Sequence, residues 1–279
     1  MITFKALGQW GRCGNQLFQY AALYNTARYN GYEFGIPYKN ETPTYFVNDP
    51  RGSFKYGLEI HKCFNISALN IDDYKSLQHL KYSQIDFNYN PDILKIQDST
   101  DIIGYFQSEL YFKEYKNDVL KEFTFKNDII LKAMQLYYGL KTNNNNNTLV
   151  SLHVRRGDYT LLPEHHPLCT LEYYNNGIEY IKSKINENFT LIVFSDDISY
   201  CREMFKDYKN IEFVNNNTYT DLCLMSMCDH HIIANSSYSW WGSYLQLKDH
   251  ITIAPQIWFG TKHNNLNTRD LIPDNWIKI

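Results

Sequence analysis

Two adjacent arginines, Arg155 and Arg156, follow an apolar run, residues 148–154, that has the composition of a buried strand. A guanidinium group is a planar fork of N–H donors that matches phosphate oxygens, and each charge-assisted hydrogen bond contributes roughly 1.5–3 kcal/mol. Consecutive residues on an extended segment point to opposite faces, so one arginine is expected to bind a ligand while the other pairs internally or fastens the loop. The alternative is a structural ion-pair cluster with Asp158. The residue types favour the capture of an anion such as phosphate.

A second polar loop, Ser195, Asp196 and Asp197, follows the apolar run 191–194. Carboxylates at a strand end can accept hydrogen bonds from ribose hydroxyls or from guanine N–H groups, and they can equally cap the next helix. Two consecutive aspartates allow one of each.

A third loop, Asn-Ser-Ser-Tyr-Ser-Trp-Trp-Gly at residues 235–242, follows the apolar run 231–234. Small hydroxyl residues at a strand-to-helix junction cap the helix, and the outward-facing N–H groups of a helix N-terminus form an anion site. Capping alone is the simpler interpretation. Trp240 and Trp241 are better explained by helix packing than by sugar stacking.

The three loops belong to a C-terminal half in which short apolar runs alternate with helical patterns. Strands are expected at 148–154, 191–194, 211–214, 231–234 and 251–254, and helices at 171–184, 198–208, 221–229 and 235–247. This alternation is typical of a parallel, doubly wound sheet, in which ligands bind at the carboxyl ends of the strands.

The N-terminal half begins as a strand at 3–7, a loop with three glycines at 8–14 and a helix at 16–29. A buried strand is expected at 101–106 and helices between 109 and 139, whereas residues 40–90 show little periodicity. Five asparagines at 143–147 have neither helical nor strand preference and are interpreted as the linker between the halves.

Composition narrows the functional classes. The 279-residue chain has a net charge of −3, so it offers no overall basic field for nucleic acid. It has no signal-peptide pattern and no spanning apolar stretch, and its six cysteines are scattered, which together predict a cytoplasmic protein with reduced cysteines. Neither a Walker A loop nor an Asp-x-Asp motif is present, and a Cys/His metal site near 223–231 is disfavoured by its spacing. No metal or cofactor is expected.

Several segments together resemble glycosyltransferase family 11, the α-1,2-fucosyltransferases, over nearly the whole chain. They are GRCGNQLFQYA (11–21), GYFQS (104–108), HVRRGDY (153–159), FSDD (194–197), ANSSYSWWG (234–242), PQIWF (255–259) and LIPDNW (271–276). The arginine and tryptophan segments in this order are specific to the family, although neither is specific alone.

The resemblance implies an α/β fold of the GT-B type, with two Rossmann-like domains facing across a cleft. Residues 1–142 would form the N-terminal acceptor-side domain. Residues 148–279 would form the C-terminal GDP-fucose-binding domain, whose last helix could cross back to the first. Acceptor contacts would then lie in residues 30–100.

The resemblance also implies roles for single residues of the donor site. Arg156 would bind the β-phosphate, and Asn15, at the end of the glycine loop, would face the donor. Asp196 or Asp197 would recognise guanine. The phosphates would be held by the third loop, and the remaining members of the donor-binding set are His153, Arg155, Ser195, Asn235, Ser236, Ser237 and Tyr238.

The catalytic base is expected after the arginine loop, among Glu164, His165, His166 and Glu172. His166 is favoured because members of the family that the chain resembles often have a histidine in this stretch before a Tyr-Tyr pair. In this chain, however, Pro167 follows it where a glycine would be expected. Asp158 is the second choice, unless it anchors an arginine. Arg156 completes the expected catalytic set by neutralising the departing GDP.

The predicted activity is inverting transfer of L-fucose from GDP-β-L-fucose to the 2-hydroxyl of a terminal galactose. The expected partners are GDP-fucose and a galactose-terminated oligosaccharide or glycolipid, with peripheral membrane association left open and no nucleic acid. One alternative is a GDP-fucose-dependent transferase with another acceptor hydroxyl, on a protein or a different sugar. The other is a non-catalytic sugar-nucleotide-binding protein.

Overall fold

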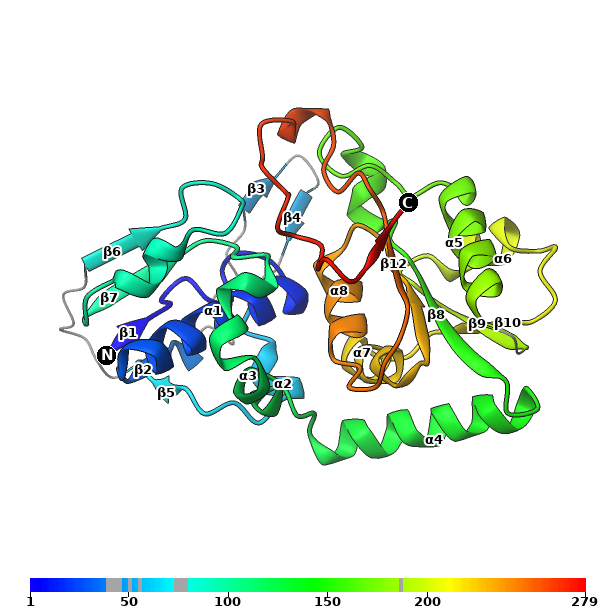
Figure 1. The fold of residues 1–279 in the computed structure, drawn as a ribbon, viewed down its shortest axis with the longest axis horizontal. Coiled ribbons are helices and arrows are strands. Elements are labelled where there is room, and N and C mark those ends of the chain that lie inside the picture. Colours follow the sequence, from blue (N-terminus) through cyan, green and yellow to red (C-terminus); the bar gives the residue numbers. More distant parts are fainter. Residues whose placement is uncertain (39–46, 50–51, 55–56, 73–79, 186–187) are drawn as a thin grey trace. The chain divides into compact units, whose positions relative to one another are not determined.

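The computed structural model describes residues 1–279 except 39–46, 50–51, 55–56, 73–79 and 186–187. The chain forms two compact units (Figure 1). The first comprises Met1–Thr124 and Asn265–Pro273, and the second comprises Phe125–Asn264 and Asp274–Ile279. None of the helices in the described ranges is long and apolar enough to cross a membrane.

The second unit is built on a six-stranded sheet in the order β10-β9-β8-β11-β12-β13, and every neighbouring pair is parallel. Numbered along the chain, this order is 3-2-1-4-5-6, so the winding direction reverses between β8 and β11. The predicted parallel, doubly wound sheet is therefore confirmed. Its strands are β8 (Thr148–Val154), β9 (Phe189–Ser195), β10 (Ile211–Val214), β11 (His230–Ile232), β12 (Thr252–Ala254) and β13 (Ile277–Lys278).

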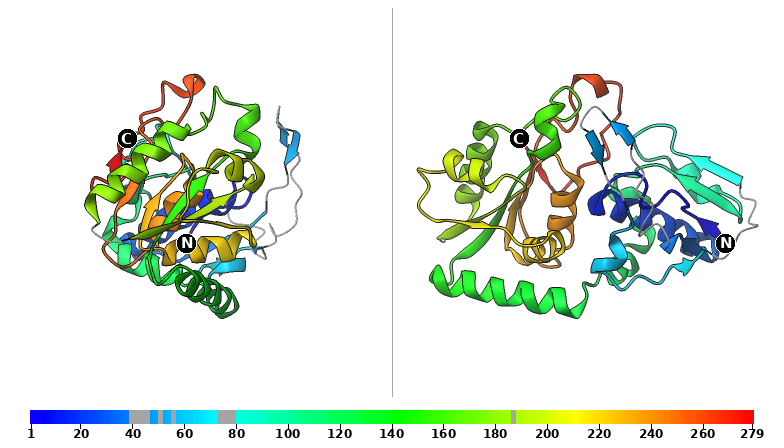
Figure 2. Two further views of the ribbon diagram at one scale, coloured as in Figure 1. Left: turned by 90° about the vertical axis from the view of Figure 1, so that its right-hand side faces the viewer. Right: turned by 180° about the vertical axis from the view of Figure 1, so that it is seen from behind.

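Helices cover both faces of this sheet, α5 and α6 on one and α7 and α8 on the other (Figures 1 and 2). The helices are α4 (Asn127–Asn143), α5 (Leu171–Lys184), α6 (Ile198–Met204), α7 (Thr218–Met227) and α8 (Ser237–Tyr244), with 3-10 turns η5 (Gly157–Leu161) and η6 (Thr261–His263). The start of α5 is fixed by Thr170, whose Oγ1 accepts a hydrogen bond from the Tyr173 amide at 3.2 Å.

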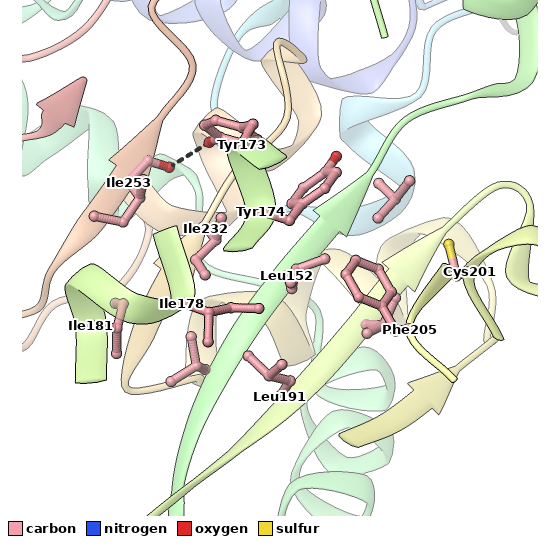
Figure 3. Packing of buried hydrophobic residues seen from close by; sticks show 13 residues of the cluster. Leu152, Tyr173, Tyr174, Ile178, Ile181, Leu191, Cys201, Phe205, Ile232 and Ile253 are labelled. Atoms are coloured by element: carbon pink, nitrogen blue, oxygen red, sulfur yellow. Dashed lines mark hydrogen bonds between the residues drawn. The ribbon is translucent and has the colours of Figure 1, made fainter. Parts of the chain in front are cut away.

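The apolar core lies between the sheet and α5 and α6 (Figure 3). Tyr174, Ile178 and Ile181 recur at helical spacing on the buried face of α5. On β8, Val150 and Leu152 point into this core, so the alternate residue His153 points to the face covered by α7 and α8.

The first unit contains a five-stranded sheet in the order β5-β2-β1-β7-β6, again with parallel neighbours. Numbered along the chain, this order is 3-2-1-5-4, so the step from β6 to β7 runs in the same direction as the steps from β1 to β2 and from β2 to β5, and the connection from β5 to β6 crosses the sheet. The strands are β1 (Ile2–Thr3), β2 (Phe34–Ile36), β5 (Leu69–Asn70), β6 (Leu80–Ser83) and β7 (Thr100–Ile103), and β3 (Val47–Asp49) and β4 (Gly52–Phe54) form a separate antiparallel pair. The helical elements are α1 (Cys13–Asn30), α2 (Ile60–Cys63), η2 (Pro91–Lys95), η3 (Glu109–Tyr111), η4 (Lys113–Tyr115) and α3 (Lys116–Glu122).

The glycine loop between β1 and α1 is fixed by buried amides and one carboxylate. Gly8 and Gly11 have φ values of 86° and 84°, which a side chain would strain. Gln16 Nε2 donates to the Gly11 carbonyl at 3.1 Å. Glu59 Oε2 accepts from the Cys13 amide at 2.7 Å, so a carboxylate distant in sequence takes the place of a cap at the positive end of α1.

The asparagine run does not form the linker expected from the sequence. Its first residue ends α4, the next residues form a turn, and β8 begins at Thr148. Because the second unit already starts at Phe125, the run lies inside that unit. The C-terminal stretch that joins the first unit is Asn265–Pro273, and the structure assigns no helix to it, in contrast to the crossing helix considered above.

Candidate active site

The three polar loops singled out from the sequence follow β8, β9 and β11, which are neighbouring parallel strands of one sheet. Their carboxyl ends therefore meet at the same edge. Two of the loops, after β8 and β11, flank the point where the winding reverses, which is where open α/β sheets bind ligands. The loops also contact one another, since the Tyr159 hydroxyl donates to the Asn235 carbonyl at 3.1 Å.

Arg155 fastens the first loop to the second. Its Nη2 lies 2.5 Å from Asp158 Oδ1 and its Nη1 lies 2.8 Å from Asp196 Oδ2. Burial opposes the charge of Arg155, but the two carboxylates outweigh it and raise the pKa of the guanidinium. With one carboxylate on each side, Arg155 has an internal structural role. This is the ion-paired alternative considered for one of the two arginines.

Arg156 is held differently. Its backbone N–H donates to Asp196 Oδ1 at 2.9 Å and its Nε donates to Asp197 Oδ2 at 3.0 Å. The guanidinium carbon lies 3.4 Å from the centre of the Tyr200 ring, so the ring supports the plane of the fork. Within the described ranges, no hydrogen bond or ion pair involves Nη1 or Nη2 of Arg156. The end of the fork is therefore available to an anion.

The two aspartates of the second loop are both engaged by the first loop. Asp196 Oδ2 packs so closely on Gly157 that a Cβ at residue 157 would collide with it, which explains the glycine. Asp197 caps α6, accepting from the Tyr200 amide at 3.1 Å, while its own amide donates to Ser195 Oγ at 2.9 Å. Its hydrogen bonds from the Tyr200 amide and from Arg156 lower the pKa of Asp197. Guanine reading by either aspartate stays a prediction.

His153 is buried on the α8 side of β8, and its ring centre lies 5.6 Å from that of Tyr238. Burial, and then the charge of Arg155, lower the pKa of His153 to about 3, so the imidazole is neutral at physiological pH. Its Nδ1 is buried and has no hydrogen-bond partner among the described residues. A buried polar atom at a strand end is a group that a bound ligand can hydrogen-bond.

The third loop joins several segments at the start of α8. Asn235 is buried, and its Nδ2 donates to the carbonyls of Pro167 and Trp258 at 2.9 and 3.0 Å, which gives it a structural role. Ser236 is the N-cap residue of α8, but its side chain makes no capping hydrogen bond in the described structure. The Tyr238 hydroxyl donates to the Thr218 carbonyl at 2.7 Å, and Ser237 is the first helical residue. The positive end of α8 thus lies in this loop.

His166, the favoured base, stacks on Tyr159 with ring centres 4.5 Å apart and an interplanar angle of 14°. It also lies 5.8 Å from the Phe259 ring. Asp158 forms the ion pair with Arg155 already described, which favours its anchoring role over its role as a base. Of the other candidates, His165 Nδ1 lies 3.0 Å from His263 Nε2 and Glu164 pairs with Lys262 at 3.3 Å. Glu172 is exposed in the first turn of α5.

Asn15 belongs to the first unit, where it lies in the first turn of α1. Its Oδ1 accepts a hydrogen bond from Gln107 Nε2 at 2.9 Å, and a Cβ on Gly11 would collide with its side chain. The structure thus brings the predicted residues of the β8, β9 and β11 loops together within the second unit.

Two aromatic residues of this site were not identified from the sequence. Tyr200 supports Arg156, and Tyr159 contacts Arg155, Asn235 and His166. Tyr159 directly follows the arginine motif, and Tyr200 is three residues after the capping aspartate. Both tyrosines could therefore have been predicted as site residues from their distance to these motifs.

The chain is similar in sequence and in fold to several known proteins. The model of the family described as Glycosyl transferase family 11 matches residues 6–279. An α-1,2-colitosyltransferase of Escherichia coli is 35% identical over 301 residues, covering 96% of each chain. Galactoside α-(1,2)-fucosyltransferase 2 of Pongo pygmaeus is 24% identical over 255 residues, covering 88% of this chain and 69% of that one. The structure of NodZ α-1,6-fucosyltransferase soaked with GDP-fucose is similar in fold, with a TM-score of 0.55, 13% identity and coverage of 90% and 94%. The predicted GT-B type of fold is thereby confirmed.

Proposed function

Because this chain belongs to glycosyltransferase family 11, it is a glycosyltransferase, and we propose that it transfers L-fucose from GDP-β-L-fucose to the 2-hydroxyl of a terminal galactose. The proposed binding of GDP rests on one observation. Asp197 and Tyr200 hold the guanidinium of Arg156 at the carboxyl ends of the strands, with its terminal nitrogens available. Two relatives, an α-1,2-colitosyltransferase and a galactoside α-(1,2)-fucosyltransferase, support the α-1,2 linkage.

In the proposed reaction the bond between the anomeric carbon and the β-phosphate oxygen breaks, and GDP leaves as an anion. Arg156, together with the N–H groups at the start of α8, neutralises the charge that develops on this oxygen. Neutral His153 supplies a further hydrogen-bonding atom without adding a titrating charge. The galactose 2-hydroxyl attacks the opposite face of the anomeric carbon, so the β-linked donor gives an α-linked product. Because these groups supply positive charge at the leaving group, we propose that no divalent metal is required.

The name of one relative favours GDP-colitose as a second candidate donor. A relative that is 35% identical over almost the whole of both chains is named as a colitosyltransferase. Colitose is fucose without its 3-hydroxyl, so the same pyrophosphate grip would serve GDP-colitose. The choice between these donors depends on contacts to one hydroxyl group.

The proposal is tested by measuring GDP release with GDP-fucose and with GDP-colitose, each in the presence and absence of lactose and with EDTA. We expect rapid release from GDP-fucose that requires lactose and persists in EDTA. Lactose-independent turnover that a protein or another sugar accelerates would indicate a different acceptor. Tight GDP binding without any turnover would indicate a non-catalytic protein and contradict the proposal.

We propose His166 as the base that takes the proton of the attacking hydroxyl. The stacking on Tyr159 fixes its ring plane, which is what a general base needs. His166→Ala is expected to lower kcat by about 10²–10⁴-fold with an unchanged affinity for GDP. His250→Ala, at a histidine outside this loop, is the matched control and should keep kcat. Full turnover of His166→Ala would rule out this role.

A further inference from the structure

The first unit exposes two aromatic rings side by side at the carboxyl ends of the parallel strands in its sheet. Trp10 lies in the glycine loop after β1, and Tyr105 lies in the loop after β7, the strand next to β1. The two residues are 42% and 39% exposed, so both rings are accessible to a ligand. The ring centres are 6.5 Å apart with an interplanar angle of 36°. The two loops follow the carboxyl ends of adjacent parallel strands, the side on which open α/β sheets bind ligands.

The loop that carries Tyr105 is held in a costly conformation. Phe106 has a φ of 51°, a left-handed value that is a genuine outlier for a bulky residue. Its ring is buried and packs edge-to-face on Phe4 and Tyr111, at 6.2 and 5.1 Å. Gln84 Oε1 accepts hydrogen bonds from both the Tyr105 and the Phe106 amides, at 2.8 and 3.0 Å. Strain that the surroundings enforce in this way is characteristic of binding sites.

The two loops are also fixed to one another. Gln19 is fully buried on α1, and its Nε2 donates to the Trp10 carbonyl at 3.3 Å and to the Gly104 carbonyl at 3.1 Å. A Cβ on Gly104 would lie 2.6 Å from Gln84 Cβ, so the backbone can pass this close to Gln84 only because residue 104 is a glycine. One amide side chain thus sets the spacing between the residues that carry the two rings, and the pair is preorganised before any ligand arrives.

We propose that Trp10 and Tyr105 form an aromatic platform that binds the terminal galactose of the acceptor. In a galactopyranose ring the axial 4-hydroxyl leaves the hydrogens of C3, C4 and C5 together on one face, and this apolar face packs on aromatic rings. The amides of Asn15 and Gln107, bonded to each other at 2.9 Å, lie in the same two segments and provide polar groups for the ring hydroxyls. The platform lies outside the range 30–100 in which acceptor contacts were expected, part of which is outside the described residues. This assignment rests on the proposed function for the identity of the sugar.

Four variants test the platform. Trp10→Ala and Tyr105→Ala should each raise the KM for lactose by about tenfold or more, because each removes one stacking surface. Trp10→Phe and Tyr105→Phe keep a ring and should restore most of the affinity. GDP affinity and the slow hydrolysis of donor without acceptor should be unchanged in all four. Tyr29→Ala, which removes an exposed ring on α1 of the same unit, is the matched control.

A direct binding measurement separates this inference from the proposed function. Intrinsic tryptophan fluorescence is titrated with lactose and, as a comparison, with maltose, which ends in glucose. Lactose should change the fluorescence of the unaltered protein, the change should be smaller in Trp10→Phe, and Tyr105→Ala should not respond. If lactose binds but no fucose is transferred, the proposed function fails and the platform stands. If lactose does not bind, or if both alanine variants keep the original KM, the platform is excluded.

Discussion

Replacing Arg156 by lysine is expected to lower kcat by about 10²–10³-fold while the protein remains folded. Lysine keeps the positive charge but loses the planar fork, and each charge-assisted hydrogen bond contributes about 1.5–3 kcal/mol. The supporting contacts of Arg156 also depend on its shape, since Tyr200 stacks on the guanidinium and Asp197 accepts from Nε. Arg156→Ala, which loses the charge as well, should be more severe.

The measurement is steady-state GDP release under saturating donor and acceptor, together with GDP affinity by calorimetry. Arg202→Lys is the matched control, because Arg202, on α6, is another arginine whose guanidinium lies beside an aromatic ring, 4.7 Å from the Phe213 ring centre. It should change kcat by less than about twofold. Retention of near-normal kcat by Arg156→Lys would mean that the fork does not act on the leaving phosphate.

Replacing the neighbouring Arg155 by methionine is expected to destabilise the fold. Arg155 pairs with both Asp158 and Asp196, at 2.5 and 2.8 Å. Its removal takes one cation away from two partly buried carboxylates, which should lower the free energy of unfolding by about 2–4 kcal/mol. Because Asp196 also accepts from the Arg156 amide, the backbone of the phosphate-binding loop should loosen too.

Urea unfolding followed by circular dichroism measures this effect, with Arg156→Met as the comparison. The ion pair of Arg156 is with Asp197, whose side chain is more exposed, and such pairs contribute little to stability. Arg155→Met/Asp158→Asn should recover part of the loss, since it removes one of the stranded charges. Equal unfolding midpoints for Arg155→Met and Arg156→Met would contradict the separate roles assigned to the two arginines.

The second unit was predictable from local patterns. The bounds of β8, β10 and α5 agree with the sequence predictions, because each is a short apolar run or an amphipathic repeat ended by polar residues. Helices α6 and α8 end earlier than predicted, at Met204 and Tyr244, and α7 begins earlier, at Thr218, where Asn217 accepts from two backbone amides as the cap. The membership of family 11, stated from the motifs, is confirmed by the match over residues 6–279.

The missed features depend on contacts between residues that are far apart in the sequence. Alternation along a strand indicated that the two arginines differ, but the position of Asp196, 41 residues after Arg155 in the chain, decides which one is structural. The expected strand at 101–106 ends at Ile103, because Gln84 draws the next amides into a left-handed turn at Phe106. The asparagine run failed as a domain marker because α4 packs on α7 within the second unit.

The linkage of the product tests the central proposal most directly. The protein is incubated with GDP-fucose and lactose, and the trisaccharide is purified and analysed by NMR. We expect a single product in which α-linked fucose is attached to the 2-position of galactose, with inversion relative to the β-linked donor. A fucose on another carbon, a β-linked product, or donor hydrolysis with no trisaccharide would contradict this account.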